Sequence, residues 1–206
     1  LFLGTDLLGR DILSRIIFGA RVSLVAALVT VSLGAGVGSL LGLLSGYYGG
    51  WTDTIVMRLA DAMLSIPIIL LALLFAVLFG PSLSNVVIVL ALAMWARFAR
   101  LVRGEALSWK ERDFVTLARC IGASDLRIIF RHLLPNVMNP MIVLATLQLS
   151  WVIILEASLS FLGAGVPPHV PSWGIMVSEG RAYLTTAWWL SVFPGLAIAL
   201  LVFSFN

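Results

Sequence analysis

The sequence predicts an all-α integral membrane protein, and two observations carry that prediction. Of the 206 residues, 61% are hydrophobic and only 11% are charged, whereas about a quarter of the residues in an ordinary soluble domain are charged. Two long stretches, Val22 to Thr52 and Ala62 to Ala96, contain no Asp, Glu, Lys or Arg. Each exceeds the roughly 20 apolar residues that a helix needs to cross a bilayer. We therefore expect the chain to be inserted in a membrane.

Five membrane-spanning helices can be placed in order along the chain. A first span over residues 22–46 is followed by Gly46-Tyr47-Tyr48-Gly49-Gly50, which predicts a turn. The second uncharged stretch is too long for one span and is interrupted at residues 80–85 by Gly, Pro, Ser and Asn, which predicts a helical hairpin. The remaining spans are expected at residues 61–79, 86–103, 137–161 and 185 to the end.

The arginines and the lysine predict the orientation of these spans. Eight of the 13 basic residues lie within residues 97–131, and Lys and Arg near span ends remain in the cytoplasm. The segment 104–135 is therefore expected inside, and residues 1–21 and 162–184 outside. An N-terminus in the cytoplasm would then require a further span before Leu1, so we expect six spans in the full chain. Residues 1–206 are expected to form a single transmembrane domain.

Several kinds of chemistry are not supported by the sequence. Cys120 is the only cysteine, which excludes an intramolecular disulfide, and His132 and His169 lack the spacing of metal ligands. We therefore expect no metal site and no catalytic residues. Because the basic charge is concentrated in one predicted loop, it indicates membrane topology rather than nucleic-acid binding.

The charged loop itself shows helical periodicity. Asp113 is placed to cap a short helix in which apolar residues recur at the spacing of one face, namely Phe114, Leu117, Ala118 and Ile121. Gly122 interrupts this helix. A second helix after Ser124 is expected to end at Pro135, which would lead into the next span. Two interpretations remain open: the helices lie on anionic lipid, or they dock in a groove of a cytoplasmic partner.

A ridge of glycines and several polar residues stand out within the predicted spans. Small residues at every fourth position, namely Gly34, Gly38, Gly42 and Gly46, let another helix approach closely. Candidates for the lining or gate of a pathway are Gln148, Ser150, Glu156, Asp61 and Arg58. For Glu156 a structural role is equally open, Asp61 could instead pair with Arg58 at the membrane surface, and Gln148 and Ser150 could join helices by hydrogen bonds.

Several motifs carry a family resemblance over nearly the whole chain. The charged loop holds Thr116-Leu117-Ala118, Gly122-Ala123-Ser124 and Leu134-Pro135 at the spacing of the EAA loop in ABC importer permeases, with Thr116 where that motif has Glu. Further matches are Leu3-Gly-Thr-Asp-Leu-Leu-Gly-Arg-Asp11, Gly46-Tyr-Tyr-Gly-Gly-Trp-Thr-Asp53, Glu156-Ala-Ser-Leu-Ser-Phe-Leu-Gly163 and Pro171-Ser-Trp-Gly174. Together they resemble the second permease of the dipeptide, oligopeptide and nickel importer family.

The resemblance implies a type I importer fold in a bacterial or archaeal inner membrane. It implies a homologous second permease, two ABC ATPase subunits that hold ATP and Mg²⁺, and an external substrate-binding protein as partners. It also implies that the loop is the coupling contact with the ATPase, through Phe114, Thr116, Leu117, Ala118, Ile121, Gly122, Ala123, Ser124, Leu134 and Pro135. The substrate expected from this family is a peptide, a nickel chelate or glutathione.

The sequence lacks a Gly-x-x-x-x-Gly-Lys-[Ser/Thr] phosphate loop, so ATP hydrolysis is expected on a partner. The alternative function is an ion-coupled secondary transporter or channel with a basic loop at the membrane surface. Such a transporter should carry ionisable residues near the midplane of several spans, whereas here Glu156 alone approaches that position. An intramembrane enzyme is a further alternative, but the sequence offers no paired catalytic groups.

Overall fold

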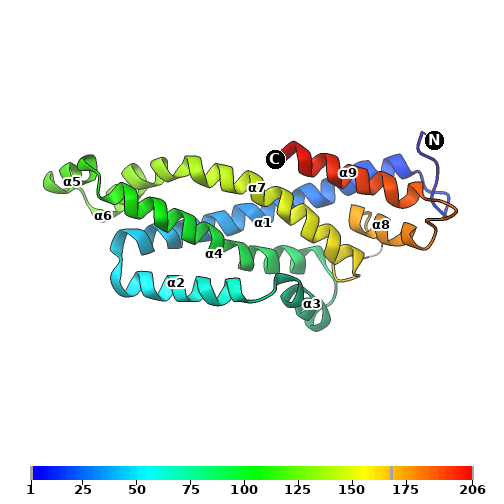
Figure 1. Ribbon diagram of the computed structural model, residues 1–206, viewed down its shortest axis with the longest axis horizontal. Coiled ribbons are helices and arrows are strands. Elements are labelled where there is room, and N and C mark those ends of the chain that lie inside the picture. The colour runs from blue at the N-terminus through cyan, green and yellow to red at the C-terminus, as the bar shows by residue number, and fades with distance from the viewer. Residues whose placement is uncertain (1, 168, 206) are drawn as a thin grey trace. The chain divides into compact units, whose positions relative to one another are not determined.

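The structure is a computed structural model that describes residues 2–167 and 169–205, and most of these residues are helical (Figure 1). In chain order the helices are α1 (Ile12–Tyr48), α2 (Gly50–Ser65), α3 (Ile68–Phe79), α4 (Leu83–Lys110), α5 (Asp113–Cys120), α6 (Asp125–Arg127), the π-helix η1 (Ile128–Leu133), α7 (Leu134–Phe161), α8 (Trp173–Arg181) and α9 (Trp189–Phe205). Leu1, Asn206 at the end of the last predicted span, and Pro168 in the predicted external loop lie outside the described residues.

Three helices in the described part of the chain are long and apolar enough to cross a membrane: α1, α4 and the continuous helix from Asp125 to Phe161. A fourth candidate arises if α2 and α3 together form one broken span. The apolar helix α9 is shorter, with 17 residues. The prediction of an all-helical chain with several candidate spans is thus confirmed.

Helix α1 begins ten residues before the predicted start of the first span. The carboxyl group of Asp11 accepts a hydrogen bond from the backbone N–H of Ser14 at 2.9 Å and from its hydroxyl at 2.6 Å. This satisfies one of the N–H groups that lack a partner in the first turn of a helix. Residues 12–21 are therefore helical, and the predicted external segment of residues 1–21 is non-helical only before Ile12.

The predicted span over residues 61–79 is not one helix. Helix α2 starts earlier, at Gly50, and ends at Ser65, because Ile66 is extended (φ −85°, ψ 125°) before Pro67. Proline disfavours the α conformation of the residue before it. The prediction of a continuous helix across Pro67 was wrong for this reason, and α3 begins after the break at Ile68.

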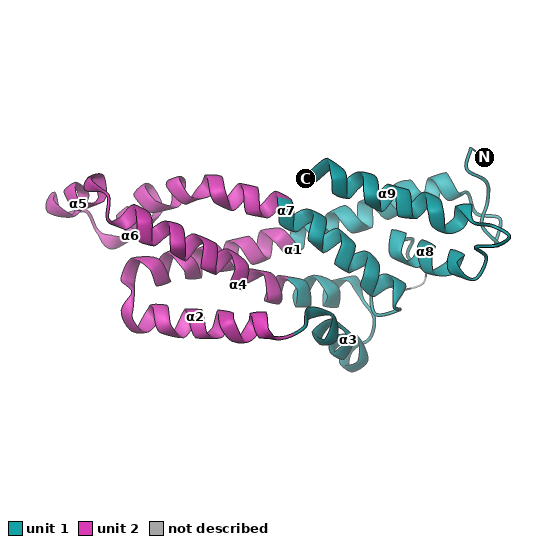
Figure 2. Ribbon diagram, in the orientation of Figure 1, with its two compact units in different colours: residues 1–30, 67–90, 147–206 teal, residues 31–66, 91–146 magenta. Residues whose placement is uncertain are grey.

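The described residues form two compact units, which Figure 2 distinguishes by colour. Unit 1 comprises residues 1–30, 67–90 and 147–206. Within it α8 and α9 pack side by side (Figure 1), around a core of Ile12, Trp173, Met176 and Leu190. The indole N–H of Trp173 donates to the carbonyl of Ile16 at 2.9 Å, which attaches the start of α8 to α1.

Unit 2 comprises residues 31–66 and 91–146. Its core joins the C-terminal half of α1 to α4, α5, η1 and α7 through buried apolar side chains: Leu43, Tyr47, Val102, Ala106, Val115, Ala118, Ile128, Ile129, Leu133 and Val137. The short helices of the predicted loop are thus packed on the ends of the long ones.

Pro135 does not end a helix, contrary to the prediction. The chain is helical from Asp125 through to Phe161, and the turn just before the proline is a π-helix, where the N–H of Leu134 bonds to the carbonyl of Ile129. A proline ring in a helix clashes with the carbonyl four residues earlier and lacks an N–H. The wider π-turn accommodates both, and such turns commonly mark functional segments.

Candidate functional site

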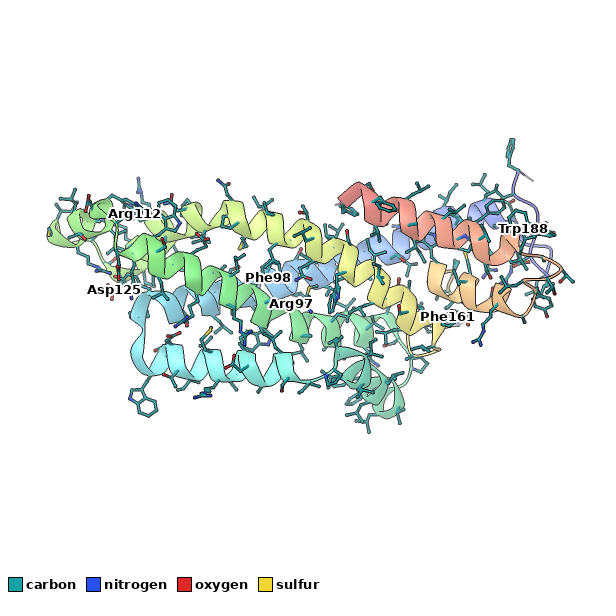
Figure 3. All side chains as sticks on the ribbon, viewed as in Figure 1. Arg97, Phe98, Arg112, Asp125, Phe161 and Trp188 are labelled. Carbon is teal, nitrogen blue, oxygen red and sulfur yellow. The ribbon has the colours of Figure 1, made fainter. Side chains whose placement is uncertain are left out.

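The loop between α4 and α7 is shorter than the predicted segment 104–135, because α4 continues to Lys110. Helix α5 begins at Asp113, but Arg112 is its N-cap residue and no side chain caps it, so the predicted cap by Asp113 was wrong. The phenol of Tyr47 donates to Asp125 at 2.6 Å, which attaches the start of α6 to α1. Figure 3 shows Arg112 and Asp125 at the same end of unit 2.

Gly122 ends α5 in a left-handed turn. Its φ is +81°, its N–H bonds to the carbonyl of Arg119, and the N–H of Ala123 bonds to the carbonyl of Ala118. These two bonds form a Schellman motif, in which glycine is favoured because it lacks a Cβ. The interruption predicted at Gly122 is therefore a specific turn that ends α5 before α6 begins.

The face predicted for α5 divides between the core and the surface. Ala118 is buried in the core of unit 2 together with Val115, which the periodicity did not single out. Phe114, Leu117 and Ile121 are 37%, 63% and 85% exposed. The second helix divides in the same way, with Ile129 and Leu133 buried and Leu126 and Phe130 exposed. Large apolar side chains that stay exposed in one place mark an interaction surface.

The exposed side chains of Phe114, Leu117 and Ile121 line a shallow groove of about 280 Å³, together with Ala118, Ala123, Arg127 and His132. The ring of Phe114 lies 6.2 Å from that of His132 and 6.3 Å from that of Trp109. Thr116 and Ser124 are exposed but are not among the residues that line the groove, and Leu134 packs against the core of unit 2. The surface is apolar at its centre and basic at its edge. We refer to the groove with its exposed apolar rim as the α5 groove.

The predicted glycine ridge on α1 faces α4 within unit 2. A Cβ at Gly38 would lie 2.3 Å from the carbonyl oxygen of Trp95, and one at Gly42 would lie 2.6 Å from that of Ala99. At Gly34 and Gly46 the nearest atoms are Cβ atoms of α4, at 2.7 and 2.8 Å. Helix α4 therefore approaches α1 so closely that only glycine fits at these positions.

Glu156 is fully buried in unit 1, where it joins two helices and a loop. Its carboxyl group accepts hydrogen bonds from the hydroxyls of Ser23 in α1 and Ser160 in α7, each at 2.8 Å. The Ser160 hydroxyl in turn accepts from the backbone N–H of Val166. Ser150 and Gln148 are also buried in α7, and the Ser150 hydroxyl donates to the carbonyl of Val202 in α9. Ser23 and Val202 were not identified from the sequence, because their partners are far away along the chain.

A charged cleft lies between α2 and α4 in unit 2. It is lined by Asp53, Thr54, Met57, Arg58, Asp61, Arg100 and Arg103. Asp61 forms an ion pair with Arg100, so the predicted pair with Arg58 was wrong. Asp53 accepts hydrogen bonds from Ser45 at 2.5 Å and from Arg103 through both Nε and Nη2. The sequence indicated Arg100 and Arg103 only as markers of membrane topology. Their spacing of three residues, about one helical turn, is the signal that predicts a shared helix face.

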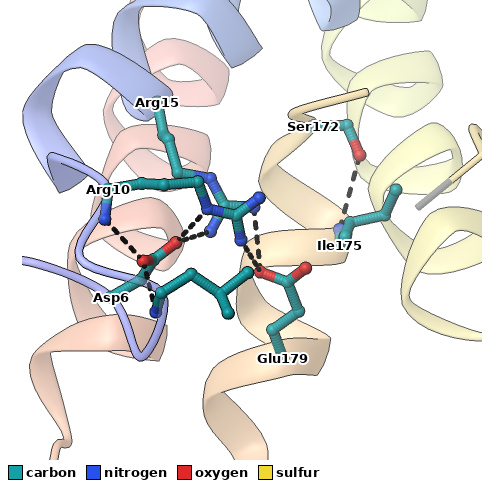
Figure 4. A network of polar contacts seen from close by, with 7 residues as sticks. Asp6, Arg10, Arg15, Ser172, Ile175 and Glu179 are labelled. Atoms are coloured by element: carbon teal, nitrogen blue, oxygen red, sulfur yellow. Dashed lines mark hydrogen bonds and ion pairs between the residues drawn. The ribbon is translucent and has the colours of Figure 1, made fainter. Parts of the chain in front are cut away.

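Another charged network connects the start of the chain to α8 in unit 1 (Figure 4). Arg15 bonds to Asp6 at 2.8 Å and to Glu179 at 2.8 Å, and Arg10 bonds to Asp6 at 2.6 Å. Burial raises the pKa of Asp6, but the hydrogen bonds from Arg10 and Leu8 outweigh it and hold that pKa below its usual value. The network fastens residues 6–15 to α8.

Among the described residues no group of three or more His, Cys, Asp or Glu is placed to hold a metal ion. The geometry thus comprises long apolar helices, a close helix contact, two charged clusters and an exposed apolar groove beside a π-turn. Together these features define a multi-span helical membrane protein with a surface suited to binding another protein.

The chain belongs to the family of binding-protein-dependent transport system inner membrane components, whose family model matches residues 38–206. It is 44% identical over 205 residues to a glutathione transport system permease protein of Pectobacterium atrosepticum, covering all of this chain and 68% of that protein. It is 45% identical over 203 residues to a putative peptide transport system permease protein of Brucella suis, covering 98% and 68%.

Solved structures share the fold at lower sequence identity. An inward-facing structure of the MetNI methionine ABC transporter matches with a TM-score of 0.70 at 20% identity, over 93% of this chain and 91% of that one. A structure of an amino acid ABC transporter with histidines matches with a TM-score of 0.69 at 15% identity, over 95% and 94%. The fold is that of ABC importer permeases.

The predicted class is therefore confirmed: the chain is a multi-pass inner-membrane permease subunit of a binding-protein-dependent ABC transporter. It is not itself catalytic, and ATP is bound by the partner ATPase. A binding-protein-dependent system also implies an external binding protein as a partner.

Proposed function

We propose that the chain forms half of the translocation pathway of an importer for short peptides, including glutathione, and that the α5 groove is its contact with the ATPase. A homologous second permease supplies the other half, and two ATPase subunits bind below. Support for the substrate comes from relatives at 44 and 45% identity that are described as glutathione and peptide transport permeases.

The topology that goes with this function has five spans in residues 1–206 and a sixth before them, all in one permease domain. In this arrangement α2 and α3 form one broken span, and α9 forms the last. The basic residues from Lys110 to Arg131 then lie at the cytoplasmic side, which is where the α5 groove must be to meet an ATPase.

The exposure of Leu117 and Ile121 is the observation that carries the coupling role. Leu117 lies in α5 and Ile121 is the C-cap residue of that helix, whose opposite side is buried in the core of unit 2, so the helix is anchored while these two side chains stay exposed. An apolar helix face that docks in a groove provides both affinity and a direct mechanical connection. The Schellman turn at Gly122 and the continuous helix through η1 and α7 would carry movement of α5 to a long helix.

Co-purification of the assembled transporter tests this role. Leu117→Gln together with Ile121→Gln should reduce recovery of the ATPase subunits with the permease by about tenfold or more, since well-packed apolar anchors carry most of the binding energy at an interface. Leu162→Gln, which changes an exposed leucine after α7, is the matched control and should recover the ATPase normally. Equal recovery in all three proteins would refute the proposed contact.

Reconstitution with a binding protein and a dipeptide or glutathione tests the substrate. The proposal expects ATP-dependent accumulation of peptide in proteoliposomes. Accumulation of a nickel chelate but of neither peptide would overturn the substrate assignment and leave the permease role intact.

A further inference from the structure

The charged cleft between α2 and α4 shares no lining residue with the α5 groove. It measures about 550 Å³, and five of its seven lining residues are ionisable: Asp53, Arg58, Asp61, Arg100 and Arg103. Ionisable side chains in membrane-spanning helices face protein or a water-filled cavity, because exposure to lipid hydrocarbon is costly. The position of the cleft along the helices therefore decides whether these side chains must face protein or a water-filled cavity.

The contact between α1 and α4 shows the level of Arg100 along α1. Gly42 packs against Ala99, the neighbour of Arg100, and lies six residues before α1 ends at Tyr48. At a rise of 1.5 Å per residue this is about 9 Å from the helix end. Just before Gly42 in α1, Val37 and Leu40 are 51% and 45% exposed, as expected for contact with lipid. Arg100 and Asp61 thus lie beside a level at which α1 presents only uncharged side chains.

The charges in the cleft do not balance. Asp61 pairs with Arg100, and Asp53 pairs with Arg103, so two guanidinium groups have carboxylate partners. Arg58 is exposed in the cleft, and among the described residues it has no hydrogen bond or ion pair. With three arginines and two aspartates, the cleft has room for one more anionic group. A guanidinium binds a carboxylate through two parallel hydrogen bonds.

We propose that this cleft is part of the water-filled pathway and that Arg58, beside the Asp61–Arg100 pair, binds a carboxylate group of the passing substrate. The inference rests on the proposed function, because peptides and glutathione both carry carboxylates. A phosphate headgroup of an anionic lipid is the other source of negative charge, and the lipid composition of the vesicles distinguishes the two.

Thiol labelling tests whether the cleft is accessible to water. The assembled transporter would carry Arg58→Cys in a Cys120→Ser background, and Leu59→Cys in the same background is the matched control. Leu59 is the next residue of α2 and is 57% exposed on an apolar side of that helix. In inside-out vesicles a charged, membrane-impermeant methanethiosulfonate should label the first protein at least tenfold faster than the second. Equal rates, or faster labelling of the second, would overturn the proposal.

Transport assays test the ligand. In proteoliposomes with the complete transporter and a dipeptide, Arg58→Gln should lower uptake per ATP hydrolysed by about tenfold, as expected for the loss of one charge-assisted hydrogen bond. Arg58→Lys should retain more uptake than Arg58→Gln, because it keeps the charge. Arg21→Gln, which removes an exposed arginine of α1 outside the cleft, should behave like the wild type.

Two outcomes would overturn the carboxylate site while leaving the proposed function standing. One is wild-type uptake by Arg58→Gln. The other is a defect that appears in vesicles with anionic phospholipid but vanishes in vesicles of phosphatidylcholine alone, which would assign Arg58 to a lipid headgroup. Failure of the wild-type transporter to take up any peptide would instead refute the proposed function itself.

Discussion

The hydroxyl of Ser23 in α1 donates a 2.8 Å hydrogen bond to the carboxyl group of Glu156 in α7, 133 residues further along the chain. Both side chains are completely buried in unit 1. Because buried polar groups are stable only when they are hydrogen-bonded, these two residues require each other. Ser160 completes the cluster as the second donor to the same carboxyl group.

Replacement of Glu156 should therefore destabilise the protein most when the new side chain cannot accept hydrogen bonds from Ser23 and Ser160. Glu156→Leu leaves the hydroxyls of Ser23 and Ser160 without their acceptor and should cost about 1–3 kcal/mol for each. Glu156→Gln keeps a carbonyl acceptor and should cost less. Thermal unfolding in detergent would measure both. Ser158→Ala, which removes an exposed hydroxyl bonded only within its own helix, serves as control; an equal loss for it and Glu156→Leu would refute the role of the cluster.

Two glycines of α1 should respond oppositely to alanine. Gly38→Ala would place a Cβ 2.3 Å from the Trp95 carbonyl oxygen and 2.7 Å from the Phe98 Cβ, neither of which is a flexible group. We expect a loss of about 1–3 kcal/mol, as for other overpacked sites. Gly36→Ala meets nothing within 4 Å and should be neutral or stabilising by up to about 1 kcal/mol. The difference in unfolding temperature checks this, and its absence would mean that α4 does not pack on this ridge.

A bulky residue at Gly122 should uncouple transport from ATP hydrolysis. No atom lies within 4 Å of the position, so the effect comes from the backbone, whose φ of +81° is unfavourable for a residue with a Cβ. Gly122→Val would therefore shift α5 relative to α6. The measurement is the number of substrate molecules transported per ATP hydrolysed. Gly104→Ala, inside α4 and also without a close neighbour, is the control, and wild-type coupling in Gly122→Val would contradict the proposal.

Acid should release the segment around Asp6. Hydrogen bonds from Arg10 and Leu8 lower the pKa of Asp6 in the folded protein despite its burial. A carboxyl group with a lowered pKa contributes stability that is complete above its unfolded pKa, about 3.9, and is lost as the pH falls through the folded value. Asp6→Asn should therefore unfold at a lower temperature than wild type at pH 7, and the difference should close below about pH 4.

The exposed carboxylate of Glu111, which has no ion pair among the described residues, offers the comparison for this pH series. Glu111→Gln should follow the wild-type curve of unfolding temperature against pH. A constant difference between Asp6→Asn and wild type over the whole range would show that the network with Arg15 and Glu179 does not depend on the charge of Asp6.

Local features of the fold were predictable where local chemistry decides them. The uncharged run from Val22 to Thr52 predicted a helix, and Gly122 predicted an interruption, because each depends on the residues at that place. The predictions of where helices end were wrong at two prolines, because the backbone beside each proline decides whether the helix continues. Pro67 and Pro135 are the same residue type, but the helix ends before Pro67 and continues past Pro135. The π-turn of η1 precedes only Pro135.

By itself the sequence determined the membrane class, the helical spans and the amphipathic loop, because composition and periodicity act over one or two helical turns. Tertiary structure alone decided which polar residues meet. Asp61 could reach Arg58 within its own helix but pairs with Arg100, 39 residues away, since α2 and α4 lie on either side of one cleft. Likewise Leu117 and Ala118 look equivalent along the chain, and only the packing of α5 on unit 2 buries one and exposes the other.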